Sequence, residues 1–282
     1  LEMFMQHSAD KKGWDPSRIT TTWFDSHFNH AAQRVIEWLS PELPGERPIS
    51  LMDFGCGGSI TTLGVALRYP GAEVHGVDIG DKYLQLPELA KDQLNLQALP
   101  ANLHLRQIQP MQPLAREYDI DAIFSWSVFE HIPQSQIPVI MQDLYNMLPP
   151  GGLFFLQIEP LYYSPWVSHL RRFIDTPWAH LLWSPEELRK AVLEYDGDIP
   201  PQHQGHQYRE LDMQAFKRFH LGEYDSLNKI TADQMAGFML DAGFEIARQQ
   251  RLRLDLEIPR DLLKRYNAQD LLTNGILLLA RK

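Results

Sequence analysis

ISLMDFGCGGS, residues 49–59, joins a short apolar run to an acid and then to a cluster of glycines. The apolar run predicts a buried strand, because turn signals bound it on both sides. The glycines that follow permit backbone conformations and close approaches that a Cβ would block. The stretch therefore predicts a strand that turns into a ligand-holding loop, and the rest of the chain can be placed relative to it.

The segment after this loop continues as a helix and a second strand. ITTLGVALRYPG, residues 60–71, places apolar residues along one helical face and closes with proline and glycine. EVHGVD then predicts a strand ending in Asp78, which follows Gly58 by 20 residues. At this spacing an acid at the end of the second strand reaches a ribose hydroxyl in nucleotide-binding units. A nucleoside ligand is favoured.

The glycine pattern does not match the dinucleotide fingerprint. GxGxxG needs a third glycine where Ile60 stands. Asp53, two residues before Gly55, would also repel a pyrophosphate. A ligand with a cationic end fits this loop better.

At these residues the chain resembles the class I S-adenosylmethionine-dependent methyltransferases. Their first motif, D/E-x-G-x-G-x-G, stands here as Asp53, Gly55, Gly57 and Ser59, with serine in place of the last glycine. VDIG (77–80), DAIFSWSVFEHI (121–132) and LPPGGLFFLQIEP (148–160) follow in the family's order. The resemblance implies an α/β fold with a Rossmann-like, doubly wound sheet of about seven strands and an antiparallel edge strand. It also implies S-adenosyl-L-methionine as cofactor.

The resemblance further implies which residues bind the cofactor. The predicted set gathers at the carboxyl ends of the strands. Its members are Asp53, Gly55, Cys56, Gly57, Ser59, Asp78, Ile79, Ser125 and Trp126. In the family an acid after the third strand often binds the adenine amino group, and here Gln107 and Gln109 are the candidates to accept that bond.

Composition limits the class of protein. The 282 residues are 44% hydrophobic with a net charge of −10, so the chain can bury a large core and has no basic field for nucleic acid. The one cysteine, Cys56, excludes an intrachain disulfide, and no apolar run is long enough for a membrane span. A cytoplasmic protein without membrane or nucleic-acid partners is expected. No metal site is expected either, since His203 and His206 stand in a polar loop without a carboxylate pair.

The order of the predicted elements divides the chain into four parts. An N-terminal arm and helix occupy 1–48, the cofactor-binding core 49–160, an acceptor-binding insertion or lid 161–228, and the rest of the core 229–282. Within them we expect helices at 24–39, 134–148, 184–195 and 231–243, and a helical segment broken by Pro87 at 81–100. Strands are expected at 102–108, 118–126, 153–158 and 276–281, and alternating leucines extend a further strand toward Ile258.

The insertion is expected to bind the methyl acceptor. It holds eleven of the thirty aromatic residues and five of the eleven histidines. Tyr162, Tyr163 and Trp166 are candidate walls for a substrate ring, although they could equally form the lid's own core. For the base that removes a hydroxyl proton, His169 is the first candidate, followed by His131 and Glu159. Each histidine has a structural alternative, packing or capping for His169 and a strand-ending loop for His131.

The sequence therefore predicts a methyltransferase that acts on a small molecule, through a hydroxyl of a sugar or natural product. Two alternatives remain open. A NAD(P)-dependent Rossmann oxidoreductase would need a more complete glycine pattern. A non-catalytic S-adenosylmethionine-binding protein would not need the large aromatic insertion. The sequence leaves the oligomeric state open, including a homodimer.

Overall fold

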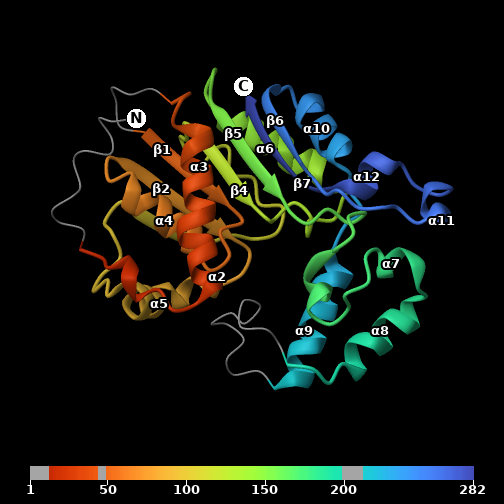
Figure 1. Cartoon of the computed structure of the whole chain (residues 1–282). Helices are drawn as coiled ribbons and strands as arrows, with labels where there is room; N and C mark the ends of the chain where they lie inside the picture. The colour runs from red at the N-terminus through yellow and green to blue at the C-terminus, as the bar shows by residue number, and fades with distance from the viewer. Residues whose placement is uncertain (1–12, 44–48, 199–211) are drawn as a thin grey trace.

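Seven strands form one mixed sheet at the centre of the protein, in the order β3-β2-β1-β4-β5-β7-β6 (Figure 1). The computed structural model describes residues 13–43, 49–198 and 212–282, without the side chains of Ser168 and His169. The strands are β1 (Ile49–Phe54), β2 (Ala72–Asp78), β3 (Leu103–Gln107), β4 (Ala122–Trp126), β5 (Leu153–Ile158), β6 (Glu245–Arg253) and β7 (Thr273–Arg281). β7 runs antiparallel to both of its neighbours, and the remaining pairs are parallel. The expected seven-stranded Rossmann-like sheet with an antiparallel edge is confirmed.

Successive residues of the central strands face opposite layers of helices. Leu51 packs on one face and Met52 on the other, and Phe155 and Phe154 divide in the same way. Since all six residues of β5 are buried, this strand lies in the interior of the sheet with both faces covered.

Helices cover the two faces of the sheet. One layer contains α2 (Thr22–Asp25), η2 (Ser26–Ala31), α3 (Ala32–Leu39), α4 (Ile60–Arg68) and α5 (Leu86–Leu94). The other contains α6 (Ile137–Met147) and α10 (Ala232–Asp241). Short helical turns add η1 (Pro16–Arg18), η3 (Lys82–Gln85), α11 (Arg260–Leu263) and α12 (Ala268–Leu272).

The insertion forms a helical lobe beyond the sheet (Figure 1). Its described elements are η4 (Ser168–Arg172), α7 (Ala179–Leu182), α8 (Pro185–Glu194) and α9 (Met213–Ser226). Phe173, Leu188 and Phe216 belong to a small core of its own. Trp178 fastens the lobe to the C-terminal part of the chain, because its ring packs on Leu262 and Leu271 and its Nε1–H donates to Leu271 O at 3.2 Å.

Two of the expected helices begin with a capping box. Ser184 accepts from the N–H of Glu187, whose side chain accepts from the N–H of Ser184. Thr231 and Gln234 form the same reciprocal pair at the start of α10. These caps satisfy backbone donors that a helix start leaves free, so the boundaries could be read from the sequence.

Two local expectations were wrong. Pro87 does not break a helix; it lies in the first turn of α5. The backbone N–H groups of a helix's first turn have no intrahelical acceptor, so the N–H that proline lacks is not missed there. β6 ends at Arg253 after register shifts, so the alternation of Leu254, Leu256 and Ile258 continues outside the strand. Alternation alone does not extend a strand where the ladder of hydrogen bonds stops.

Gly64 in α4 packs directly against η2 and the start of α3, so a substitution there tests how closely these N-terminal helices pack on the core. A Cβ on Gly64 would lie 2.6 Å from Phe28 O and 2.7 Å from Ala32 Cβ. Gly64→Ala should therefore lower the free energy of unfolding by about 1–3 kcal/mol, measured by urea denaturation. Gly237→Ala in α10 is the matched control, because its Cβ would meet nothing within 4 Å, and it should raise stability by about 0.5–1 kcal/mol. Equal effects of the two changes would contradict this packing.

Candidate active site

The glycine loop after β1 is tied to the end of β2 through its backbone. Gly55 N–H and Cys56 N–H both donate to Val77 O, at 2.8 and 3.0 Å. Gly55 has φ +81°, and a Cβ there would lie 2.5 Å from Val128, so the position requires glycine. These bonds fix the loop at the carboxyl edge of the sheet, where residues 55–59 line a cavity.

Asp78 organises two loops at once. Its Oδ2 accepts from Gly57 N–H at 2.8 Å and its Oδ1 from Gly80 N–H at 2.7 Å. Each carboxylate oxygen can accept more than one hydrogen bond, so both keep capacity for a ligand donor. A vicinal diol of a ribose could be held there.

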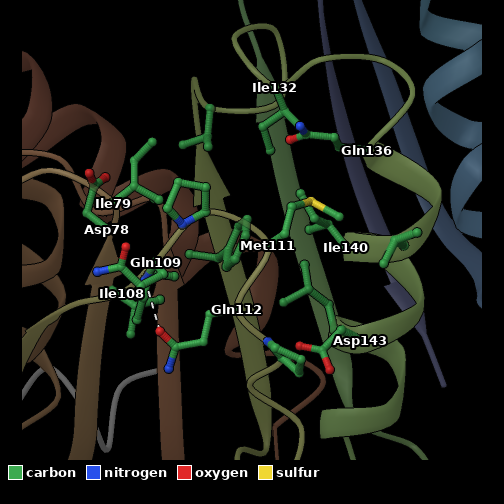
Figure 2. Close-up of a pocket in the computed structure, with 18 of the residues that line it drawn as sticks. Asp78, Ile79, Ile108, Gln109, Met111, Gln112, Ile132, Gln136, Ile140 and Asp143 are labelled. Carbon is green, nitrogen blue, oxygen red and sulfur yellow. Dashed lines mark hydrogen bonds between the residues drawn. The ribbon is translucent and has the colours of Figure 1, made fainter.

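The Asp78 cavity, of about 570 Å³, lies on one side of the glycine loop. Asp78, Ile79, Ile108 and Gln109 line it, and Figure 2 shows them together with Met111. Ile79 is 60% exposed, so a flat ligand bound in this cavity would cover it. The mostly apolar lining suits a purine ring.

The two glutamine candidates are placed differently. Gln109 lines the Asp78 cavity, and its backbone N–H donates to Gln112 Oε1 at 2.9 Å (Figure 2). Gln107 is not part of that lining; its Nε2 donates to Ile79 O at 2.9 Å and so stabilises the loop that follows β2.

The Glu130 cavity, of about 590 Å³, lies on the other side of the loop and shares Gly55 and His131 with the first. Three elements distant in sequence line it: the N-terminal helices, the ends of the central strands, and the insertion. Its charged or titratable lining residues are His27, His30, Asp53, Cys56, Lys82, Glu130, His131, Glu159, Arg172 and Glu223. The cavity can therefore hold a cationic group and a polar acceptor at once.

Two buried acids of this cavity have raised pKa values. Burial raises the pKa of Asp53 to about 7, against a 2.6 Å hydrogen bond from Thr62 Oγ1. Glu130 is 3% exposed, and burial, with smaller contributions from Glu159 and Glu223, raises its pKa to about 8. Glu130 Oε2 has no hydrogen-bond partner among the described residues. A cation or hydrogen-bonding group of a ligand would compensate for this burial.

A hydrogen-bond chain fixes the tautomer of His131. Its Nδ1 lies 2.9 Å from Ser226 Oγ, which in turn lies 2.7 Å from the backbone oxygen of Glu223. The carbonyl can only accept, so the serine hydroxyl donates to it and accepts from His131 Nδ1–H. The lone pair of the neutral ring therefore lies on Nε2. Burial lowers the pKa of His131, although Glu223 acts in the opposite direction. The ring is then neutral near pH 7 and able to take a proton.

Asn228 holds the loop that carries Glu130 and His131. Its Nδ2 donates to Phe129 O and Ile132 O at 2.6 and 2.7 Å, and its backbone N–H donates to Glu130 O at 2.8 Å. The end of the insertion thus positions the loop after β4.

The other predicted cofactor residues lie around the same loop. Cys56 and Ser59 line the Glu130 cavity, and Trp126 closes its sheet edge. Ser125 is buried and its Oγ donates to Phe54 O at 2.8 Å, so it joins β4 to β1. Burial raises the pKa of the Cys56 thiol well above its usual value, which leaves the thiol protonated.

The predicted catalytic and substrate residues are only partly brought together. Glu159 lines the Glu130 cavity and its Oε1 accepts from Asn274 Nδ2 at 2.7 Å. His169 lies in η4, and its side chain is outside the described residues, as are His203 and His206. Tyr162 and Tyr163 line a different cavity, and Trp166 packs against Arg171 with 4.5 Å between ring centroid and guanidinium.

Several lining residues were not foreseen from the sequence. Trp23, His27 and His30 come from α2 and the π-helix η2, which covers the Glu130 cavity. Single-turn π segments are frequent at functional sites, but the amphipathic pattern of 24–39 gives no sign of one. Arg172, Phe219 and Glu223 reach the cavity from the insertion, through tertiary packing alone.

The strand order, the glycine loop and the acid at the end of β2 define a nucleoside-binding α/β enzyme. The sequence matches the family described as a methyltransferase domain over residues 24–249, and the chain belongs to that family. It is therefore a methyltransferase with S-adenosylmethionine as cofactor, and the oxidoreductase and non-catalytic alternatives are not retained.

Curated relatives carry methyltransferase names. The ubiquinone biosynthesis O-methyltransferase of Acinetobacter baylyi is 28% identical over 203 residues, covering 69% of this chain and 78% of that protein. The protein of the same name from Acinetobacter baumannii is 30% identical over 149 residues, or 50% of this chain and 59% of its own length. Among solved structures, a SAM-dependent methyltransferase from Anabaena variabilis has a TM-score of 0.51 and 17% identity, covering 92% of this chain and 86% of that one. At that identity the likeness shows the fold alone.

Two properties of the described residues bear on metals and membranes. No group of three or more histidine, cysteine or acidic side chains in this part of the chain could hold a metal ion. Within the same residues no helix is both long and apolar enough to cross a membrane.

The raised pKa of Glu130 predicts a pH-dependent stability. The unfolded chain loses this proton near 4.5 and the folded protein near 8, so the contribution of Glu130 to stability falls as pH rises between these values. Glu130→Gln has no proton to lose. We compare the free energies of unfolding of Glu130→Gln and the wild type, both without cofactor. As pH rises from 5 to 8, the difference between them should shift in favour of the variant by at least about 1 kcal/mol. Parallel pH curves for the two proteins, measured by urea denaturation, would show that burial does not raise this pKa.

Proposed function

We propose that the protein transfers a methyl group to the hydroxyl of a small natural product, with the acceptor bound in the Glu130 cavity. The observation that carries the proposal is the hydrogen-bond chain that leaves the lone pair of a neutral His131 on Nε2, in a residue that lines both the Asp78 cavity and the Glu130 cavity. The curated relatives, both named O-methyltransferases, support an oxygen as the methylated atom.

The two cavities suit the two halves of the cofactor. Asp78 would accept from the ribose hydroxyls, while Ile79 and Ile108 would cover the adenine, whose amino group Gln109 could bind. The methionine half would pass Gly55 into the Glu130 cavity, where Asp53 and its neighbours favour a cation. S-adenosylmethionine supplies a methyl carbon made electrophilic by the positive sulfur.

The chain's own residues would then align the acceptor and remove its proton. S-adenosylmethionine would supply the methyl group to the hydroxyl oxygen and leave as S-adenosylhomocysteine, and His131 Nε2 would take the hydroxyl proton. Trp23, Trp126 and Phe219 line the cavity and offer aromatic surface to a bound acceptor. The insertion contributes through Arg172, Phe219 and Glu223, rather than through Tyr162, Tyr163 or Trp166.

The pKa of the base favours a phenolic hydroxyl over a sugar hydroxyl. A phenol ionises at about 10, several units below an aliphatic alcohol, so a histidine whose pKa is below its usual value can deprotonate it at lower cost. The aromatic walls of the cavity would pack on the phenol ring. A sugar hydroxyl remains the competing acceptor, and a panel of catechols and glycosides, assayed by release of S-adenosylhomocysteine, separates the two.

Replacing Asp78 should weaken cofactor binding. Asp78→Ala removes the acceptor for the ribose and should cost about 1.5–3 kcal/mol in affinity for S-adenosylhomocysteine, measured by calorimetry. Asp81→Ala is the matched control, because this acid lies three residues on and lines neither cavity, and it should leave the affinity unchanged. If Asp78→Ala binds as tightly as the wild type, the ribose does not lie at Asp78.

Replacing His131 should remove the base without removing the cofactor. His131→Ala should lower kcat at least about a hundredfold on the accepted catechol, with S-adenosylhomocysteine affinity nearly unchanged. In the wild type kcat/KM should rise with pH through an apparent pKa below the usual histidine value, because burial lowers the pKa of His131, and this rise should be absent from the variant.

His169→Ala is made in parallel, since His169 was the first candidate from the sequence. A loss below about tenfold in His131→Ala, with the large loss in His169→Ala, would assign the base to His169. Glu159→Gln is the third variant, and a loss confined to it would assign the role to Glu159.

A further inference from the structure

A third cavity, which we call the Tyr266 cavity, lies between the insertion and the C-terminal part of the chain. It has a volume of about 260 Å³ and shares no lining residue with the Asp78 and Glu130 cavities. The lining residues that matter here are Tyr162, Tyr163, Tyr224, Lys229, Arg265 and Tyr266. This volume is below the usual range for drug-sized ligands, so it would hold a molecule with about one ring.

Aromatic rings form most of the wall. The rings of Tyr162 and Tyr224 are stacked with centroids 6.4 Å apart, and those of Tyr163 and Tyr266 lie 5.5 Å apart. His180 is held at the Tyr162 ring, because its Nε2–H donates to the backbone oxygen of Tyr162 at 2.8 Å. Such walls offer flat faces and ring edges to a planar ligand.

The charge of the lining is positive although the chain carries −10 overall. Lys229 Nζ lies 5.2 Å from the centroid of Tyr162, and the Arg265 guanidinium lies 5.0 Å from that of Tyr266. Burial lowers the pKa of His180 to about 4, so this ring is neutral near pH 7. No aspartate or glutamate lines the cavity, and Asp225 close to Tyr224 is paired with Arg189 at 2.5 Å.

We propose that the Tyr266 cavity is a second ligand site, which binds a small aromatic carboxylate with its ring among the tyrosines and its charge near Lys229 and Arg265. Lys229 and Arg265, the rim residues, are exposed, and the four tyrosines of the lining are half-buried, so the site offers both positive charge and aromatic surface. Arg265 also donates to Leu181 O and to the Tyr266 hydroxyl, which hold its guanidinium at the cavity. A neutral ring lacks the charge for these cations, and an aliphatic acid lacks the ring for the tyrosines.

The two sites adjoin along α9. Tyr224 lines the Tyr266 cavity, and its neighbour Glu223 lines the Glu130 cavity and accepts from Ser226, the partner of His131.

Benzoate is the probe that tests the site on the full chain, by calorimetry. For a ligand of this size we expect a Kd of about 1 mM or below. Benzamide, which lacks the charge, and cyclohexanecarboxylate, which lacks the aromatic ring, should each bind at least about threefold more weakly. Saturating S-adenosylhomocysteine should change the benzoate affinity less than about twofold, because the sites share no residue.

Variants locate the binding. Lys229→Met and Arg265→Met should each weaken benzoate binding about two- to fivefold, the range for an exposed charge pair. Lys264→Met is the matched control, because this lysine adjoins Arg265 in sequence but pairs with Asp261 at 2.8 Å and does not line the cavity. Since Arg265 also donates to Leu181 O, Lys229→Met tests the charge should Arg265→Met fail to fold.

The site is supported if Lys229→Met and Arg265→Met both weaken benzoate binding and Lys264→Met leaves it intact. Equal affinity for benzamide, displacement by S-adenosylhomocysteine, indifference to both rim variants, or no saturable binding below about 10 mM would each overturn it.

Discussion

The glycine loop depends on hydrogen bonds from its backbone N–H groups to the last two residues of β2. Val77 O accepts from Gly55 and Cys56, and the Asp78 carboxylate accepts from Gly57. The same carboxylate accepts from Gly80 N–H in the loop that follows β2. These bonds require that β1 and β2 lie side by side in parallel register, as the pairing of Phe54 with Val77 shows. Once the register is set, both loops leave the sheet at the same edge, and the ligand crevice follows from the topology.

The loop after β1 and several helix boundaries could be predicted because their signals are local. The positive φ at Gly55 and the acid at the end of β2 each follow from a few adjacent residues, as do the capping boxes of α8 and α10. The kind of sheet required more: the expectation of about seven strands with an antiparallel edge came from four motifs in the family's order, and the strand order itself came from the structure. The two errors arose where one sequence pattern fits two structures. A proline such as Pro87 can break a helix or stand in its first turn. Alternating leucines beyond Arg253 fit either a strand or an extended loop.

The walls of the Glu130 cavity could not be predicted, because tertiary packing brings them together. Trp23 and His27 precede the glycine loop by about thirty residues, and Phe219 and Glu223 follow it by more than 150. Composition correctly marked 161–228 as aromatic, but it could not separate the rings that line the Glu130 cavity from those that line another cavity. The structure makes that separation: Phe219 faces the Glu130 cavity, and the tyrosines at 162, 163 and 224 face the Tyr266 cavity.

Asn228 shows how the insertion and the core become one site. Its side chain binds two carbonyls of the loop after β4 and its backbone binds a third, so the loop holding Glu130 and His131 is fixed by the residue at which the insertion ends. Ser226, two residues earlier, orients His131. Because burial raises the pKa of Glu130 to about 8, this acid is protonated near pH 7, and a cation that enters the cavity would favour its charged form. Ligand binding and the charge state of Glu130 are therefore interdependent.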